Sequence, residues 1–365
     1  MGPSVLTQPF PRVEGRVVCG EVPLEDLAAE FGTPLYVYDL AWIRGRVAAF
    51  RKAFEGADPL LAYSVKANGN LALLRELRAL GCGADITSGG ELYRAVSAGI
   101  DGSEIVFAGV GKSEAEIAFA LDEGIYAFNV ESRSELERID RVAAEKGVTA
   151  RFGIRVNPNV LASTPHQYTA TGHSETKFGV PWEETRALYR WALGRDALDP
   201  IGIDVHIGSQ IVDTEPYVQA LDRVLAVVAE LRQEGVRLEY LDIGGGFGIS
   251  YGHGPALDLE ALAAQIVPRV VDANLRLVLE PGRSLVGEAG AFLTRVQYVK
   301  SGGPKTFVIV DGGMSDNIRT ALYGAEYSVR LASRSSSAPP MLCRVVGKHC
   351  ESGDVVRSEE HTSEL

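Results

Sequence analysis

The chain has 365 residues, of which 46% are hydrophobic and 23% charged, and its formal net charge is −12 at pH 7. This length and apolar content permit two ordinary domains, or one large α/β barrel with a smaller partner. The acidic balance argues against nucleic acid or a membrane surface as a partner, and no apolar run is long enough for a membrane span, so we expect a cytoplasmic protein.

Short β-rich runs alternate with helical patterns from residue 34 to about residue 300. Residues 1–33 are predicted to be irregular, because prolines and charges interrupt them. Mostly apolar, β-branched runs of this length are typical of strands buried on both faces of a parallel sheet. The eight expected strands are residues 61–67, 83–88, 105–109, 127–131, 151–157, 203–209, 238–244 and 277–283.

The segments between these runs carry helix signals. Residues 215–235 place apolar residues at helical spacing, and Gly235 stands where a C-terminal cap belongs. Ser113 with Glu116, and Ser132 with Glu135, are each predicted to form a capping box.

Eight strands alternating with seven or eight helices fill the length of a (β/α)8 TIM barrel, and a doubly wound open sheet is the alternative. After residue 300 the sequence turns to strands separated by turns. We therefore predict a barrel at residues 34–298. Residues 1–33 and 299–365 are predicted to form a smaller, discontinuous β-rich domain.

Polar residues gather where the predicted strands end. In a parallel barrel all carboxyl ends meet at one face, which carries the functional groups. A lysine, a histidine, several acids and two glycine-containing turns are expected at this rim. The residues are Lys66, Asp85, Gly109, Glu131, Asn157, His206, Gly244–Gly246 and Glu280–Arg283.

Lys66 has two interpretations. A lysine at a strand end most often extends its amine to water. Desolvation at a barrel mouth would instead lower the pKa of the amine and make it nucleophilic toward a carbonyl. Spacing alone favours the first interpretation.

The glycine turns at residues 244–248 and 280–283 are the second signal. Glycines let backbone N–H groups approach a phosphate, although a plain tight turn explains each run equally well. Two such turns on neighbouring strands suggest one shared phosphate. The first turn does not have the GxGxxG spacing of a dinucleotide site.

Histidine and cysteine residues are ambiguous by themselves. His206 is either a structural hydrogen-bonding residue or a group that stacks on an aromatic cofactor, with Ser209 donating to phosphate. Four scattered cysteines, Cys19, Cys82, Cys343 and Cys350, predict neither a disulfide framework nor a metal site. Reactivity of Cys350 would require an electropositive, accessible setting.

Six motifs occur in order: YSVKAN, HIGSQ, GGGFG, EPGRS, IRTALYG and CESGD. Together they resemble the pyridoxal-phosphate-dependent decarboxylases built on an alanine-racemase-like barrel, over roughly residues 30–355. Glu351, which follows Cys350, resembles the diaminopimelate branch of that family, since the ornithine and arginine branches usually carry aspartate there.

The resemblance implies the cofactor pyridoxal 5'-phosphate and a role for each matching residue. Lys66 corresponds to the lysine that bonds the cofactor, His206 to the histidine stacked on its ring, and Glu280 to the acid that pairs with the pyridine nitrogen. The remaining cofactor-binding residues implied are Asp85, Ser209, Gly245, Gly246, Gly282 and Arg283.

The resemblance also implies the reaction, decarboxylation of meso-2,6-diaminopimelate to L-lysine and CO2. Arg283, Arg319 and Tyr323 correspond to groups that hold the distal end of the substrate. Cys350 and Glu351 correspond to residues that reach the partner subunit's site in a homodimer. There the cysteine supplies a proton, and the glutamate meets the distal ammonium group.

Several alternatives remain open at this level. The substrate could be ornithine, arginine or carboxynorspermidine, the reaction could be racemisation, or the chain could be an inactive relative that binds the cofactor. Family members continue beyond CESGD, and the tail RSEEHTSEL does not resemble them. We therefore expect a C-terminal truncation that leaves the β-rich domain incomplete.

Overall fold

A computed structural model describes residues 8–160, 177–252, 254–303, 305–333 and 341–362. The chain forms two compact units. The larger unit contains residues 44–249 and 255–287. The smaller contains residues 1–43, 250–254 and 288–365.

The larger unit is a closed barrel of eight parallel strands. Neighbouring strands pair in chain order from β5 to β9, then β11, β12 and β13, which returns to β5. The predicted α/β barrel is therefore confirmed. The strands are β5 (Leu60–Ser64), β6 (Gly83–Ile86), β7 (Ile105–Phe107), β8 (Ala127–Val130), β9 (Ala150–Asn157), β11 (Leu198–Asp204), β12 (Tyr240–Asp242) and β13 (Arg276–Leu279), with the short β10 (Val180–Pro181) beside β9.

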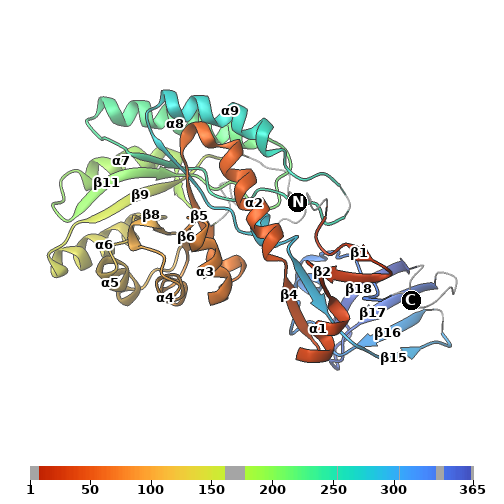
Figure 1. The fold of residues 1–365 in the computed structure, drawn as a ribbon. Helices are drawn as coiled ribbons and strands as arrows, with labels where there is room; N and C mark the ends of the chain where they lie inside the picture. The colour runs from red at the N-terminus through yellow and green to blue at the C-terminus, as the bar shows by residue number, and fades with distance from the viewer. Residues whose placement is uncertain (1–7, 161–176, 253, 304, 334–340, 363–365) are drawn as a thin grey trace. The chain divides into compact units, whose positions relative to one another are not determined.

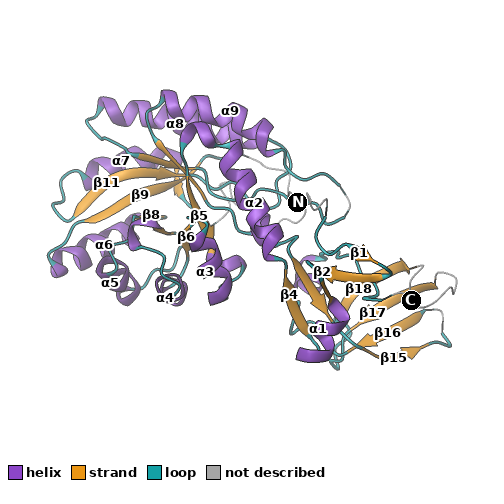
Figure 2. Ribbon diagram, viewed as in Figure 1, coloured by secondary structure: helices purple, strands orange, loops and turns teal. Residues whose placement is uncertain are grey.

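Helices surround the barrel strands on the outside (Figures 1 and 2). Their buried faces carry the apolar residues expected of amphipathic helices. Within the described part of the chain, no helix has the length and apolarity to span a bilayer. The helices are α2 (Leu40–Ala53), α3 (Leu71–Ala79), α4 (Gly89–Ser97), α5 (Glu114–Asp122), α6 (Arg133–Lys146), α7 (Trp182–Ala192), α8 (Glu215–Gln233), α9 (Leu259–Asp272) and α10 (Arg283–Val286), with 3-10 turns η1 (Glu55–Ala57), η2 (Val65–Ala67) and η3 (Gly102–Glu104).

Most predicted strands extend beyond the carboxyl ends of the strands in the structure. The structure ends β5 at Ser64 and places Lys66 in the turn η2. It ends β11 at Asp204, two residues before His206. Several residues just after the strands are also buried and apolar, among them Val65, Val205 and Ile207, so composition alone does not mark the last paired residue.

The predicted helix signals are largely confirmed. Ser113 and Glu116 form both halves of a capping box at α5. The second box is half wrong, because Ser132 caps α6 but the Glu135 carboxylate accepts from the Glu131 N–H at 2.9 Å instead. Gly235, just after α8, has φ of 87°, which fits the predicted cap.

The smaller unit is built from three sheets. Strands β1 (Arg12–Val13), β2 (Arg16–Cys19) and β3 (Val22–Pro23) form the first, β4 (Leu35–Tyr38) and β14 (Gly290–Leu293) the second, and β15 (Val296–Lys300), β16 (Thr306–Val310), β17 (Met341–Val346) and β18 (Val355–Thr362) the third. It also contains helices α1 (Leu24–Phe31) and α11 (Arg319–Tyr323).

The prediction that residues 1–33 are irregular was wrong. Within this segment α1 packs Leu24, Leu27 and Ala28 against Phe10 and Val17. These three residues have the i, i+3, i+4 spacing of a helix face, but eight residues between prolines and glycines give a weak signal.

Candidate active site

Lys66 lies beside Asp85 at the carboxyl end of the barrel. The turn η2 directly after β5 directs the Lys66 Nζ to 3.4 Å from Asp85 Oδ2, on neighbouring β6. The Ser64 hydroxyl lies 2.7 Å from the same carboxylate oxygen and 3.0 Å from the Glu280 carbonyl oxygen. Glu280, Ser64 and Asp85 thus form one series of hydrogen bonds that ends at the Lys66 amine.

Of the two interpretations of Lys66, the structure does not support a lowered pKa of the amine. The Asp85 carboxylate raises the pKa of the Lys66 amine, and its effect, with that of Glu280, outweighs the desolvation that lowers it. The Lys66 side chain keeps 53% of its surface exposed, so desolvation is incomplete. In the cofactor-free protein the amine is therefore a cation paired with Asp85.

A polar layer lies above an apolar layer inside the barrel. Successive inward positions on a strand are two residues apart. On six strands the lower position is apolar or glycine, and the upper one is polar and buried. The pairs are Ala62/Ser64, Ala127/Asn129, Gly153/Arg155, Gly202/Asp204, Tyr240/Asp242 and Val278/Glu280.

Carboxyl groups dominate this polar layer. Burial and the neighbouring Asp242 carboxyl raise the pKa of Glu280 well above its ordinary value. Burial likewise raises the pKa of Asp242 to about 6, against hydrogen bonds from the Gly244 N–H, Glu280 and Asn129. These buried acids therefore keep protons that exposed acids would lose.

Arg155 is the buried guanidinium of the layer. Its Nη1 lies 3.2 Å from Glu131 Oε1, and its Nε lies 4.0 Å from Asp204 Oδ2. Burial opposes its charge, but Glu131 and Asp204 raise the Arg155 pKa. Glu131 also accepts backbone N–H groups from Gly109 at 3.1 Å and Gly179 at 3.0 Å, so this carboxylate fixes two loops.

We expect Asp242→Asn to reduce the loss of folding stability with rising pH in the cofactor-free protein. The folded-state pKa of Asp242 is raised from 3.8 to about 6, so the folded protein holds this proton more tightly than the unfolded chain does. The protonated carboxyl group therefore stabilises the fold fully at low pH, and this stabilisation is lost as pH rises through about 6. A shift of about 2 units on a buried group is worth ~3 kcal/mol at most. Urea unfolding at about pH 4.5 and about pH 7.5 measures the effect.

Asp272→Asn, at an exposed position on α9, is the matched control for this measurement. It should leave the pH dependence of the free energy of unfolding as in wild type. If Asp242→Asn and Asp272→Asn show the same dependence, the buried carboxyl is not the source of it.

His206 lies at the rim as a neutral ring. Burial, Arg155 and Lys66 lower its pKa well below the ordinary value. Its Nδ1 accepts the Gly245 N–H at 3.1 Å, so the proton of the neutral ring is on Nε2. Gly244 has φ of 69°, and a Cβ there would lie 2.5 Å from Nδ1, so only glycine fits.

The turn at Gly245 and Gly246 lies against two other loops. A Cβ on Gly245 would overlap the Glu280 carbonyl oxygen, and one on Gly246 would overlap the Gly208 carbonyl oxygen. The Tyr217 hydroxyl donates to the Gly245 carbonyl at 3.0 Å. Since the Gly245 N–H donates to His206, the predicted contact of this residue with a phosphate stays a prediction.

Arg283 and Ser209 connect these loops. Arg283 Nη2 donates to the Ser209 hydroxyl at 3.1 Å. The preceding Gly282 lies close to η2, since a Cβ there would be 3.0 Å from Ser64 Cβ and 3.2 Å from Ala67 Cβ. The structure thus brings the glycine turns and the lysine turn together, as the sequence predicted.

Nine of the predicted site residues lie in the barrel, and four lie in the smaller unit. The nine are Lys66, Asp85, His206, Ser209, Gly245, Gly246, Glu280, Gly282 and Arg283; the four are Arg319, Tyr323, Cys350 and Glu351. In the smaller unit, Arg319 lies over the Tyr323 ring, with 5.2 Å from its guanidinium carbon to the ring centroid. The roles predicted for these four residues stay predictions.

Sequence reasoning missed five polar groups of the barrel interior: Ser64, Asn129, Arg155, Asp204 and Asp242. It identified polar residues at the carboxyl ends of the expected strands, but not the polar residues nearer the strand centres. The signal that would have found them is a polar residue two positions after an apolar or glycine residue near the end of a buried strand.

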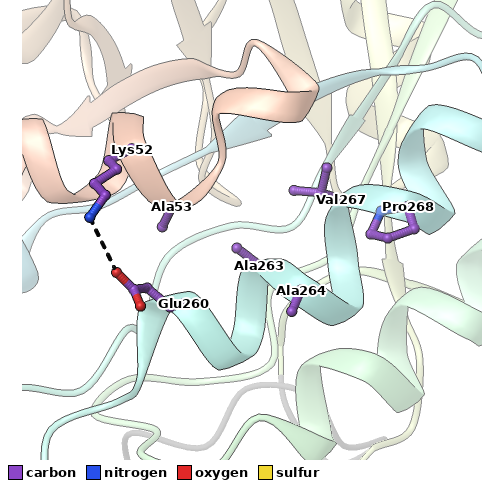
Figure 3. Close-up of a pocket in the computed structure, with 7 residues that line it drawn as sticks. All are labelled: Lys52, Ala53, Glu260, Ala263, Ala264, Val267 and Pro268. Atoms are coloured by element: carbon purple, nitrogen blue, oxygen red, sulfur yellow. Dashed lines mark ion pairs between the residues drawn. The ribbon is translucent and has the colours of Figure 1, made fainter.

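A surface hollow between α2 and α9 lies apart from this site (Figure 3). An exposed ion pair, Lys52 Nζ to Glu260 Oε1 at 3.8 Å, lies beside it. The remaining residues that line it are small or apolar, and none is a predicted site residue. They are Ala53, Ala263, Ala264, Val267 and Pro268.

The donors and acceptors at the barrel rim fit a phosphorylated aromatic aldehyde. An amine at Lys66 matches the aldehyde, a buried carboxyl at Glu280 matches a ring nitrogen, and the Arg283 guanidinium beside glycine turns matches a phosphate. A closed (β/α)8 barrel with these groups defines a pyridoxal-phosphate-dependent enzyme as the class of protein.

Comparison with known proteins identifies the family. Residues 40–287 match the family described as pyridoxal-dependent decarboxylase, pyridoxal binding domain. The chain is 47% identical over 336 residues to the diaminopimelate decarboxylase of Neisseria meningitidis serogroup A, covering 92% of this chain and 82% of that protein. It is 44% identical over 356 residues to that of Aquifex aeolicus, covering 96% and 83%.

A solved structure agrees with these relatives. The diaminopimelate decarboxylase of Helicobacter pylori, complexed with L-lysine, superposes with a TM-score of 0.89 at 40% identity, over 94% of this chain and 85% of that one. The chain therefore belongs to the pyridoxal-dependent decarboxylases, in their diaminopimelate decarboxylase branch. Its cofactor is pyridoxal 5'-phosphate.

Proposed function

We propose that this chain is a carboxy-lyase that converts meso-2,6-diaminopimelate to L-lysine and CO2. The observation that carries the proposal is the pair of Lys66 and Asp85 at the rim of the barrel. It occurs in a chain that is 47% identical to a diaminopimelate decarboxylase over 92% of its length. The L-lysine in the Helicobacter pylori structure, the product of this reaction, supports the same substrate.

The bound cofactor supplies an electron sink for the bond that breaks at the substrate's α-carbon. Lys66 would hold the cofactor through its amine, which Asp85 orients, and the neutral His206 ring would pack against it. Glu280 would keep a proton at the ring nitrogen. Ser209, Arg283 and the turns at Gly245–Gly246 and Gly282 would hold the phosphate.

The distal end of the substrate requires different groups. The planar forks of Arg283 and Arg319 suit a carboxylate, and Tyr323 adds a hydroxyl. In a cytoplasmic homodimer, Cys350 and Glu351 of one protomer reach the site of the other, where the Cys350 thiol gives a proton to the substrate carbon. We also propose two domains, the barrel at residues 34–298 and the remainder at residues 1–33 with 299–365. The compact units assign residues 34–43, 250–254 and 288–298 to the smaller unit instead.

Product analysis tests the substrate. The purified protein with added cofactor is supplied with meso-diaminopimelate, and separately with ornithine, arginine and carboxynorspermidine. We expect CO2 and L-lysine from the first substrate alone. Activity on the others but not on diaminopimelate would reject the proposed substrate and keep the decarboxylase family. Epimerisation without CO2 would indicate a racemase.

For Cys350→Ala we expect slower product formation, on the order of 100-fold in kcat, because a proton donor is lost. Cys350 is exposed, so the fold should be retained. The visible absorption band of the bound cofactor and the rate of product formation are measured together. Loss of the band in this variant would mean that the cysteine has a structural role; Cys19→Ala is the control.

A further inference from the structure

A chain of hydrogen bonds runs up the barrel interior to Glu280. The Tyr240 hydroxyl donates to Asn129 Oδ1 at 2.9 Å. Asn129 Nδ2 then donates to Asp242 Oδ2 at 3.2 Å and reaches Glu280 Oε1 at 3.5 Å. All four side chains are buried, so water cannot replace any of these bonds without entering the core.

Two glycines make room for the Tyr240 ring. A Cβ on Gly202 would overlap the ring, and a Cβ on Gly153 would lie 2.5 Å from its hydroxyl oxygen. Glycines on β9 and β11 thus leave the space that the Tyr240 ring occupies. The hydroxyl is therefore held at one place, directly below Asn129 in the order of inward positions.

Tyr240 determines which end of the Asn129 amide faces the acids. An amide has a donor end and an acceptor end, and the donor end of Asn129 faces Asp242 Oδ2 and Glu280 Oε1. The opposite end then faces the Tyr240 hydroxyl, which must donate. Burial, with Asp242 and Asp204 beside it, raises the pKa of the Tyr240 hydroxyl well above its ordinary value, so its proton is always present.

Glu280 has charged neighbours on every side. The carboxyl groups of Asp242, Asp85 and Asp204 disfavour a negative charge on Glu280. The cations near it are Lys66 and Arg155. Among the hydrogen bonds described, Asn129 is the amide that donates toward this carboxyl group, and it also bonds Asp242. Asp242 and Glu280 are themselves hydrogen-bonded to each other.

We propose that Tyr240 and Asn129 are positioning residues for Glu280. Tyr240 fixes the orientation of the Asn129 amide, and this amide holds the Asp242 and Glu280 carboxyl groups as one pair that faces the ring nitrogen of the cofactor. Neither residue acts on the substrate. The inference rests on the proposed function, because it concerns how Glu280 is prepared for that nitrogen.

Tyr240→Phe tests the proposal in the cofactor-loaded enzyme, with Tyr126→Phe as its control. The Tyr126 ring lies 5.3 Å from the Tyr240 ring, so both variants remove a hydroxyl from the same barrel interior. We expect Tyr240→Phe to lower kcat roughly 10-fold, by analogy with outer-shell partners of metal ligands. KM should stay near the wild-type value, and the pH dependence of the cofactor's visible band should shift.

Tyr126→Phe should change only thermal stability. If the two variants match in kcat and in the pH dependence of the band, the proposal is overturned. A wild-type protein with neither cofactor band nor CO2 release would overturn the proposed function itself, and the inference with it. The two failures are therefore distinguishable.

Asn129→Asp keeps the test decisive if Tyr240→Phe does not fold. The variant has nearly the same shape but loses the N–H donors and adds a carboxyl group beside Asp242 and Glu280. A protonated Asp at this position can donate again, so we expect kcat to fall at neutral pH and to recover partly as pH decreases. A kcat and a band that match wild type across this pH range would refute the positioning role.

Discussion

Lys66→Ala should abolish CO2 release and remove the cofactor's visible absorption band. The Lys66 amine pairs with the Asp85 carboxylate at the barrel's carboxyl end, and the glycine turn at Gly282 lies close to the turn that carries it. Without it the cofactor loses its covalent attachment, and a loss of at least roughly 1,000-fold in kcat is expected for a residue that bonds the reacting group.

The measurements are the absorption spectrum, before and after borohydride, and product formation. Wild type should show a band that borohydride bleaches. Lys52→Ala is the control, because Lys52 is an exposed lysine on α2 outside the barrel. It should keep both the band and the activity. A Lys66→Ala protein with a borohydride-sensitive band would place the cofactor on another lysine.

The sequence was sufficient for the barrel and most of its rim. Eight apolar runs marked the eight strands, and the polar residues near their carboxyl ends marked Lys66, His206 and Glu280 as residues of one rim. This succeeded because closure of a parallel barrel brings all carboxyl ends together, whatever their separation in the chain. Strand ends were less predictable, since buried loops have the composition of buried strands.

The electrostatics of the site could not be predicted from single residues. The pKa of Lys66 depends on a contact with Asp85, nineteen positions away. The raised pKa of Glu280 depends on carboxyl groups from other strands. Such shifts arise from pairs, and pairs are set by strand register, which one sequence does not reveal.

Glu280→Gln should lower kcat on the order of 100-fold while the cofactor stays bound. An amide has the shape of the carboxyl group but cannot keep a proton at the ring nitrogen, so the cofactor becomes a weaker electron sink. Removal of one preorganised electrostatic partner lowers kcat by about 10²–10³-fold. Attachment through Lys66 does not involve the Glu280 side chain directly, so the visible band should remain.

Glu280→Asp separates charge from geometry in this prediction. It keeps a carboxyl group but withdraws it by one methylene from Asn129 Nδ2, which lies 3.5 Å from Glu280 Oε1 in wild type. If charge is what matters, Glu280→Asp should retain more activity than Glu280→Gln, and the two kcat values measured at one pH decide this. Wild-type kcat in Glu280→Gln would show that the buried pair of Asp242 and Glu280 serves the fold alone, because its raised pKa values would then have no part in the reaction.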